Sequence, residues 1–371
     1  MSEPNLKLTR YLHGPGPSDC DPRVLQALAN PAVGYLDPDF LRIMGDVQRL
    51  LRMVWQTENE MTFPISGTGT SGMETALANL IEPGDPVLVC VAGYFGERLV
   101  EIASRWGGDV VRLDRPWGEA FDAQQIADAL RQRPAKIVAI VQAETSTGVL
   151  QPIEEISKIV HDAGALLLVD AVTSLGGVAV AVDQSHIDAA YSCTQKCLSA
   201  PSGLSPFTFG PAAVEKMKNR KEKVRSFYLD LNLIQKYWGP EHVYHHTAPI
   251  NMIFALNEAL YLIEQEGLEA RIKRHRDNAE LLWNKLEELD LSMHVPVKYR
   301  LPSLTTVRVP DGVDEAAVRK QLLQEYHIEI GAGLGALKGK VWRVGLMGYA
   351  SSAERVEMLV DALAKVLGRT G

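Results

Sequence analysis

Short apolar runs alternate with helical patterns between about residues 60 and 210, and this alternation constrains the fold more than any other feature of the chain. The runs are MTFPI, PVLVCV, KIVAIV, ALLLVD and DAAYS. Strands separated by helices are typical of βαβ units, which build a mostly parallel sheet with helices on both faces. Because KIVAIV and ALLLVD are apolar at nearly every position, we predict that both are central strands.

The segments on either side of this region predict further elements and a second domain. Residues 38–55 predict a helix, since apolar residues recur there every three or four positions. A second helical stretch, from about residue 250 to 289, is long enough to bridge two domains. After it, SLTTVRV, DEAAVRKQLLQ, VWRVGL and AERVEMLVDALAKVL predict strand, helix, strand and helix, an order that suits an α+β domain. We therefore predict an N-terminal arm at 1–20, a large domain at 21–265 and a small domain at 266–371.

The composition favours small-molecule chemistry. The 371 residues are 46% hydrophobic and 23% charged, and the net charge of -8 is spread without acidic or basic blocks, which argues against a nucleic-acid or membrane-surface partner. The four cysteines form no CxxC pair and have no histidine at metal-ligand spacing, so we expect reduced thiols and no metal site. Without an apolar leader or a long apolar stretch, a cytoplasmic enzyme is the simplest expectation.

The first candidate site is SGTGTSGMETAL, which begins at Ser66 after the run MTFPI and enters a helical pattern at Met73. Glycines here allow backbone N–H groups to point inward at a helix N-terminus, where the helix dipole also favours a phosphate. Gly67, Gly69 and Gly72 also fit GxGxxG, the dinucleotide fingerprint, and a tight strand-to-helix turn alone explains the pattern as well. No lysine follows the last glycine, which rules out a Walker A loop.

An acid and a lysine follow two of the later strands. Asp170 ends the run ALLLVD, at the edge where open α/β sheets bind ligands, and a buried carboxylate there needs a cationic or hydrogen-bonding partner. Lys196 follows the short run DAAYS among small and polar residues. A turn role for Asp170 and a solvated role for Lys196 remain the plain alternatives for each residue alone. Together with an upstream phosphate site, however, they supply the three fixed points that a pyridoxal phosphate needs.

The chain as a whole resembles the class V, fold-type I aminotransferases, and most closely the alanine–glyoxylate and serine–pyruvate aminotransferase family. The likeness covers nearly the whole chain and rests on HGPGPS at His13, GYLDPDF at Gly34, SGTGTSGMETAL at Ser66, ETSTGVLQP at Glu144, LLLVDAVTSLGG at Leu166, SCTQKCLSAPSG at Ser192, VYHHTAP at Val243 and VWRVGLMG at Val341. It implies the pyridoxal-phosphate-dependent transferase fold of type I, an α/β fold whose mostly parallel sheet is sandwiched by helices and followed by a smaller C-terminal α+β domain.

The resemblance also implies how the cofactor, pyridoxal 5′-phosphate, is held. Lys196 would bind it as a Schiff base and move the proton of the substrate α-carbon, while Asp170 would keep its pyridine nitrogen protonated. Phe95 would stack on its ring, unless it is an ordinary core residue, and Thr145 would contact the cofactor or substrate near the phenolic oxygen. The residues expected around the phosphate are Ser66, Gly67, Thr68 and Gln195, with Tyr244 and Thr247 from the neighbouring subunit of a homodimer.

Three further residues are expected at the substrate. By resemblance, Arg343 grips the substrate carboxylate, and a guanidinium suits this role because it donates two parallel hydrogen bonds in a fixed plane. Gly16 and Tyr35 fall in segments that border the substrate site, although relatives often carry His where Tyr35 stands. We expect His245 and His246 to be structural.

The resemblance implies a transaminase that moves an amino group between a small amino acid, alanine or serine, and a small 2-oxo acid, glyoxylate or pyruvate. Another class V enzyme, such as a pyridoxamine–pyruvate or phosphoserine-type aminotransferase, is the alternative within the family. A cysteine desulfurase would need a nucleophilic cysteine before Arg343, and IEIGAGLGALKGKVWR has none. A nicotinamide-dependent dehydrogenase rests on GxGxxG alone and lacks the acid that should follow the next strand. A non-catalytic binding protein of this fold would not need Lys196.

Overall fold

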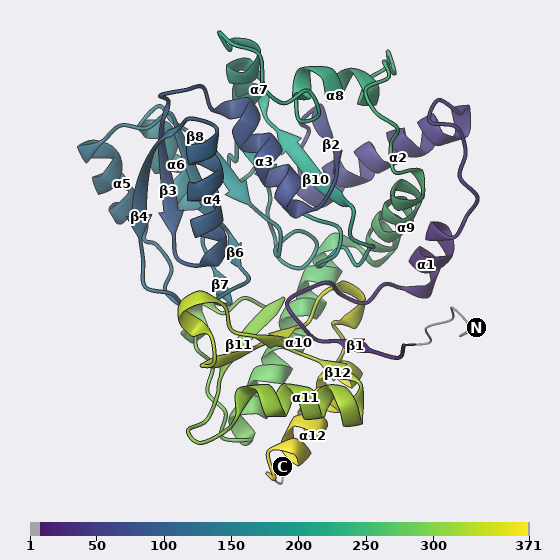
Figure 1. The fold of residues 1–371 in the computed structure, drawn as a ribbon, viewed down its shortest axis with the longest axis vertical. Helices are drawn as coiled ribbons and strands as arrows, with labels where there is room; N and C mark the ends of the chain where they lie inside the picture. The colour runs from purple at the N-terminus through teal and green to yellow at the C-terminus, as the bar shows by residue number, and fades with distance from the viewer. Residues whose placement is uncertain (1–7, 370–371) are drawn as a thin grey trace, which may run out of the picture.

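The computed structural model describes residues 8–369 and has two parts. In Figure 1 the larger part holds a broad sheet with helices around it, and the smaller part holds the green-to-yellow C-terminal elements. No helix in the described range is both long and apolar enough to cross a membrane. The α/β class that the strand pattern predicts is confirmed.

The large sheet has seven strands in the order β2-β10-β9-β8-β5-β3-β4. Strands β9, β8, β5, β3 and β4 pair in parallel, whereas β10 is antiparallel to both β9 and β2. The runs KIVAIV and ALLLVD form β5 and β8 at its centre, as predicted, because strands covered by helices must be apolar on both faces. The bounds are β2 Met61–Ser66, β3 Pro86–Val91, β4 Asp109–Asp114, β5 Ile137–Val141, β8 Leu166–Asp170, β9 Ala189–Tyr191 and β10 Leu204–Phe209.

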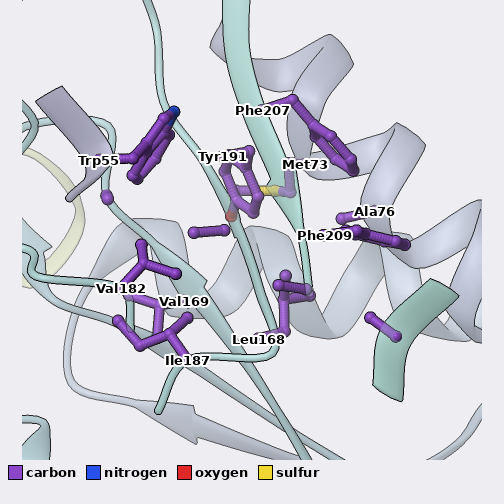
Figure 2. Packing of buried hydrophobic residues seen from close by; sticks show 14 of the residues in the cluster. Trp55, Met73, Ala76, Leu168, Val169, Val182, Ile187, Tyr191, Phe207 and Phe209 are labelled. Carbon is purple, nitrogen blue, oxygen red and sulfur yellow. The ribbon is translucent and has the colours of Figure 1, made fainter. Parts of the chain in front are cut away.

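Helices of the larger part cover this sheet. Their bounds are α1 Pro22–Leu28, α2 Pro38–Trp55, α3 Gly69–Leu80, α4 Tyr94–Arg105, α5 Ala123–Gln132, α6 Glu154–Asp162, α7 Pro211–Lys218, α8 Leu231–Trp238 and α9 Ile250–Glu266. The predicted helix at residues 38–55 is confirmed as α2, which begins after the capping residue Asp37. Figure 2 shows the core between helices and sheet, where Trp55 and Met73 pack near the strand residues Tyr191 and Phe207.

The sequence pattern missed two strands of the large sheet, β4 and β10. β4 is an edge strand and only partly buried, so it lacks the apolar signal of the central strands. β10 carries Pro206, which cannot donate a ladder hydrogen bond and therefore argues against an inner strand. In the structure the Ser205 hydroxyl donates to the Ser192 carbonyl at 2.6 Å, next to the bond that the Ser192 N–H donates to the Pro206 carbonyl at 2.8 Å. A side chain therefore replaces the donor that proline lacks.

The smaller part is built on a three-stranded antiparallel sheet in the order β11-β14-β13. The strands and helices predicted for this part are confirmed, but the helical stretch near residues 250–289 is not continuous. It divides into α9 and α10 at Gly267, whose φ of +82° interrupts the helix. The remaining bounds are α10 Leu268–Glu288, β11 Leu304–Arg308, α11 Glu315–Tyr326, β12 Ile328–Glu329, β13 Gly331–Ala332, β14 Val341–Gly345 and α12 Ala353–Val366.

The N-terminal arm joins the smaller part. Its strand β1, Tyr11–Leu12, pairs in parallel with β12. The largest cluster of buried apolar side chains runs from Phe40 to Ile263, and the second runs from Ala279 to Ala364. The predicted domain boundaries stay a prediction, and residues 1–7 of the predicted arm, like residues 370–371, lie outside the described residues.

Candidate active site

Three of the predicted site residues, Asp170, Lys196 and Ser66, lie at one edge of the large sheet. β8 ends at Asp170, and the parallel strand β9 ends shortly before Lys196. β2 ends at Ser66 and runs in the same direction as β9, because both are antiparallel to β10. Three segments far apart in the chain therefore meet where open α/β sheets bind their ligands.

Asp170 is a buried carboxylate, with 2% of its surface exposed. It accepts hydrogen bonds from the backbone N–H of Val172 at 2.9 Å and from the Tyr191 hydroxyl at 2.8 Å. Burial raises the pKa of Asp170 to about 6, even though both hydrogen bonds oppose the rise. Within residues 8–369 it forms no salt bridge. The site thus holds a desolvated carboxylate that makes no ion pair with a described residue, although the charges of Arg98 and Lys196 oppose the rise in its pKa.

Lys196 is buried beside the N-terminal arm. Its Nζ donates a hydrogen bond to the Pro15 carbonyl, and a Cβ added to Gly16, whose φ is +108°, would lie 2.7 Å from Nζ. The Ser18 hydroxyl donates to the Lys196 carbonyl at 2.7 Å, and the Ser18 N–H donates to the Gln195 carbonyl at 2.9 Å. Burial lowers the pKa of Lys196, which favours the neutral amine that a nucleophile or base requires.

The predicted phosphate site lies between β2 and α3. Gly67 has a φ of +137°, where a side chain would be strained, and its Cβ would lie 2.5 Å from the Ser71 hydroxyl oxygen. The side chain of Thr68, the N-cap of α3, makes no capping hydrogen bond, so the first turn of the helix keeps N–H donors for an anion. Gln195 has a buried Oε1 without a hydrogen-bond partner among the described residues.

Tyr244 and Thr247 lie on the segment between α8 and α9. Both are exposed, Tyr244 by 54%, and their hydroxyl oxygens are 3.4 Å apart. The Tyr35 ring lies 4.9 Å from the Tyr244 ring, and the Tyr35 carbonyl accepts a hydrogen bond from the Tyr237 hydroxyl at 3.1 Å. The structure thus groups Tyr35 with Tyr244, and its expected contact with the substrate stays a prediction.

Thr145 and Phe95 are joined through Glu144, which sequence reasoning missed as a site residue. Thr145 follows β6, Ala143–Glu144, in a hairpin with β7, Val149–Leu150, and its hydroxyl oxygen lies 2.5 Å from that of Thr173. The Phe95 N–H donates to Glu144 Oε2 at 3.3 Å, and the Ser146 hydroxyl donates to Glu144 Oε1 at 2.6 Å. Burial raises the pKa of Glu144 to about 7. The signal that identified Asp170, an acid at the end of a buried strand, would have identified Glu144 as well.

Arg343 reaches the same region from β14. Its Nε donates to the Ala332 carbonyl at 2.6 Å and its Nη1 donates to the Thr145 carbonyl at 3.3 Å. The side chain is buried and forms no salt bridge within the described range. Burial lowers the pKa of Arg343 to about 10, so the guanidinium stays charged at neutral pH. A buried cation that makes no ion pair with a described residue suits a ligand that carries a carboxylate.

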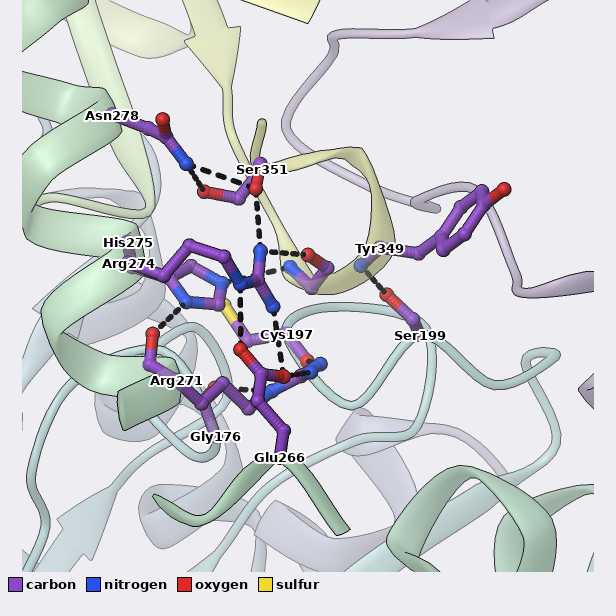
Figure 3. Close-up of polar contacts among 11 residues, drawn as sticks. Gly176, Cys197, Ser199, Glu266, Arg271, Arg274, His275, Asn278, Tyr349 and Ser351 are labelled. Carbon is purple, nitrogen blue, oxygen red and sulfur yellow. Dashed lines mark hydrogen bonds and ion pairs between the residues drawn. The ribbon is translucent and has the colours of Figure 1, made fainter. Parts of the chain in front are cut away.

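A polar network supports the segment after Lys196 from the other side (Figure 3). Arg271 on α10 donates to the Cys197 carbonyl at 2.7 Å and to the Gly176 carbonyl at 3.0 Å. Glu266 accepts hydrogen bonds from Arg271 at 2.8 Å and from Arg274 at 2.6 Å. These residues lie in a plain helical pattern, so nothing in the sequence marked them.

Comparison with known proteins decides the family. The family model described as aminotransferase class-V matches residues 10–359. The chain belongs to the class V aminotransferases. The crystal structure of alanine–glyoxylate aminotransferase from Nostoc sp. has 54% identity and a TM-score of 0.98, over 99% of this chain and 97% of that one. Alanine–glyoxylate aminotransferase of Mus musculus is 40% identical over 99% of this chain and 90% of its own length. The (S)-ureidoglycine–glyoxylate transaminase of Bacillus subtilis is 39% identical over 97% of this chain and 91% of its own length.

Class V aminotransferases depend on pyridoxal 5′-phosphate, and the residues of this aminotransferase fit that cofactor. The buried carboxylate of Asp170 lacks the cation that a protonated pyridine nitrogen provides. The amine of Lys196 is desolvated, and the backbone N–H groups at the start of α3 offer hydrogen-bond donors to a phosphate. Among residues 8–369 no cluster of His, Cys, Asp and Glu could hold a metal ion.

We expect Asp170→Asn to stabilise the cofactor-free aminotransferase in a pH-dependent way. Burial raises the pKa of Asp170 from 3.8 to about 6, so its carboxyl favours the folded chain below about pH 4, and this stability is lost as pH rises through 6. Relative to wild type, the free energy of unfolding of the variant should therefore be about 2–3 kcal/mol higher at about pH 8 than at about pH 4. Urea denaturation of wild type and variant at both pH values measures this difference. Any effect of the amide that does not depend on pH cancels when the two pH values are compared. An equal difference at the two pH values would contradict the expectation.

Proposed function

We propose that this aminotransferase transfers an amino group from alanine or serine to glyoxylate or pyruvate, with Lys196 as the catalytic base. The observation that carries the proposal is the shared burial of Lys196 and Asp170 at one sheet edge, where each lacks an ion-pair partner among the described residues. Both groups would be costly to bury unless a ligand of matching charge and shape completed the site. The class V cofactor is such a ligand.

The residues divide the chemistry between them. When bound, pyridoxal phosphate takes up the amino group covalently and withdraws electrons from the substrate α-carbon. The Nζ of Lys196 would take the proton from the α-carbon of the amino donor and pass it to the cofactor carbon that holds the amino group, which a lowered pKa assists. With the 2-oxo acid acceptor it would move a proton in the opposite direction, to the acceptor α-carbon. Asp170 holds the proton on the pyridine nitrogen, and Arg343 orients the substrate through its carboxylate.

The small substrates are supported by the relatives and by the charges of the site. Two of the three compared relatives are named alanine–glyoxylate aminotransferases, and the third is named for ureidoglycine and glyoxylate. Arg343 supplies one guanidinium, enough for one carboxylate, whereas a dicarboxylic substrate would need a second cation. Pyridoxamine as the free amino donor is less well supported, because the polar start of α3 after Thr68 suits a phosphate.

We also propose that the active form is a homodimer with shared sites. Tyr244 and Thr247 are exposed in the single chain, although the family resemblance assigns them to the phosphate. Val243, which precedes Tyr244, is 47% exposed, and Phe227 and Tyr228, whose rings lie 4.9 and 6.1 Å from the ring of His245, are 67% and 45% exposed. Exposed apolar groups gathered on a surface are typical of a subunit interface.

Replacing Lys196 by Ala should lower transamination of alanine by at least about 1000-fold, because the variant loses the base that moves the α-carbon proton. Lys158→Ala, an exposed lysine on α6, is the matched control and should retain full turnover. Pyruvate production with glyoxylate as acceptor measures both, and circular dichroism verifies that both variants are folded. Near-normal turnover of the Lys196 variant would refute the assignment.

Replacing Arg343 by Lys should lower kcat/KM for alanine by about 10- to 100-fold, mainly through KM, because an ammonium cannot donate two parallel hydrogen bonds to a carboxylate. The affinity for pyridoxal phosphate should remain unchanged. Half-reactions with alanine, serine and aspartate, followed by the absorbance of the cofactor, measure the effect. In the wild type alanine and serine should react faster than aspartate, and a preference for aspartate would refute the proposed substrate class.

Mixing two inactive variants should restore activity if the sites are shared. A hybrid dimer of a Lys196→Ala chain and a Tyr244→Ala chain contains one site in which both residues are intact. After subunit exchange, activity should approach roughly one quarter of the wild-type value, since half of the dimers are hybrids with one intact site each. The unmixed variants are the controls. If Tyr244 served the site of its own chain, mixing would restore nothing.

A further inference from the structure

His245 and His246 form a hydrogen-bonded series that ends on Ser66. His245 Nε2 lies 3.0 Å from the carbonyl oxygen of Phe227. The Nδ1 atoms of the two histidines are 2.7 Å apart, and His246 Nε2 lies 2.7 Å from the hydroxyl oxygen of Ser66. Four atoms of the two rings therefore link a backbone carbonyl to a residue of the proposed phosphate site.

The carbonyl at one end fixes every proton in this series. A carbonyl oxygen only accepts, so His245 Nε2 must carry a hydrogen. In a neutral ring the other nitrogen is then an acceptor, so His246 Nδ1 must donate to His245 Nδ1. His246 Nε2 is in turn left as an acceptor, and Ser66 donates its hydroxyl hydrogen to it. With both imidazoles neutral, Ser66 points its only hydrogen away from any other ligand.

A phosphate ester dianion can only accept hydrogen bonds. To bind it, Ser66 must turn its hydroxyl hydrogen to a phosphate oxygen, which leaves two acceptors, Ser66 Oγ and His246 Nε2, facing each other. A proton on His246 Nε2 removes this conflict, because the ring can then donate to the Ser66 oxygen. The Phe227 carbonyl prevents the pair from supplying this proton by exchanging tautomers, since His245 Nε2 must keep its own hydrogen.

We propose that the His245–His246 pair takes up one proton from solvent when a phosphate monoester binds beside Ser66, so that an imidazolium faces the phosphate through the serine hydroxyl. This inference rests on the proposed function, which places the cofactor phosphate at Ser66. When the phosphate binds, a proton from solvent forms an N–H bond at His246 Nε2. The Ser66 O–H bond stays intact, but its hydrogen turns from His246 Nε2 to a phosphate oxygen. No bond to phosphorus breaks.

The surroundings of His246 keep the pair uncharged before the anion arrives. Its ring lies 5.0 Å from His245, 5.2 Å from Tyr228 and 6.1 Å from Tyr237, and within residues 8–369 neither histidine forms a salt bridge with a carboxylate. The Tyr228 hydroxyl donates to the Ser66 carbonyl at 3.3 Å. Burial, aided by His245, lowers the pKa of His246 to about 4. The bound dianion supplies the negative charge that favours the imidazolium.

Calorimetry of the cofactor-free, full-length chain counts the proton. Pyridoxamine 5′-phosphate and pyridoxamine are titrated separately at about pH 8, where a phosphate monoester is a dianion, in buffers of different ionisation enthalpy. Neither compound has an aldehyde, so neither bonds covalently to Lys196, and both carry the same ring and amine. The difference in proton uptake between them therefore belongs to the phosphate. Because the pKa of His246 is about 4 in the cofactor-free chain, full uptake at pH 8 requires the bound phosphate to raise this pKa above about 8. We expect the phosphorylated compound to take up more protons than the other, with the excess growing towards one as the pH is lowered to about 7.

His246→Gln separates proton uptake from structure. The glutamine amide donates to Ser66 without needing a proton, so the dissociation constant for pyridoxamine 5′-phosphate should stay within about threefold of wild type at pH 8 while the extra uptake falls to about zero. His161→Gln is the matched control, since His161 lies on α6 beside Asp188, before β9 and away from the site. This variant should retain the wild-type proton count.

The outcomes distinguish the inference from the proposed site. Equal uptake with both compounds in the wild type overturns the inference and leaves the phosphate site in place, provided that the phosphorylated compound binds more tightly. Undiminished extra uptake in His246→Gln also overturns it, because the proton then goes elsewhere. If the phosphate adds no affinity in the wild type, the proposed placement of the cofactor fails and the inference fails with it.

Discussion

The structure of the active site depends on the burial of an acid and a lysine that do not form an ion pair with each other. Asp170 and Lys196 end up in the same desolvated edge of the sheet, where the pKa of the carboxyl is raised and that of the amine is lowered. In a protein without a ligand such burial is a cost to stability. In a class V aminotransferase the cost is offset when the cofactor binds, because it brings a ring cation for the acid and an aldehyde for the amine. Stability and catalysis therefore depend on the same two side chains.

The N-terminal arm connects this edge to β14, the strand that carries Arg343. The N–H of Gly345, two residues after Arg343 in β14, donates to the His13 carbonyl at 2.8 Å. On the other side of the arm, Ser18 donates hydrogen bonds to the carbonyls of Gln195 and Lys196, through its N–H and its hydroxyl group. The close approach requires small residues, since a Cβ on Gly345 would lie 2.1 Å from the Gly14 carbonyl oxygen. The arm thus contacts both the segment that carries Lys196 and the strand that carries Arg343.

Hydrogen-bond direction adds a constraint that charge alone does not show. Ser66 has one hydroxyl hydrogen, and the backbone carbonyl of Phe227 determines through two imidazoles where that hydrogen points. A site built in this way is electrically neutral when empty and gains its positive charge together with the anion. Because the proton arrives with the anion, the cofactor-free chain does not bury an unpaired imidazolium, which would lower its stability.

The sequence by itself determined the central strands, the helix α2, the elements of the smaller part and the candidates at strand ends, because apolar periodicity and the ends of buried runs are local signals. It did not determine the antiparallel strand β10, whose Pro206 is compensated by Ser205, or the break at Gly267. Only the tertiary structure decided that His246 contacts Ser66, across 180 residues, and that Arg271 holds the Cys197 carbonyl. Such contacts depend on how separate segments pack, and no periodicity within one segment encodes the direction of a hydrogen bond to another.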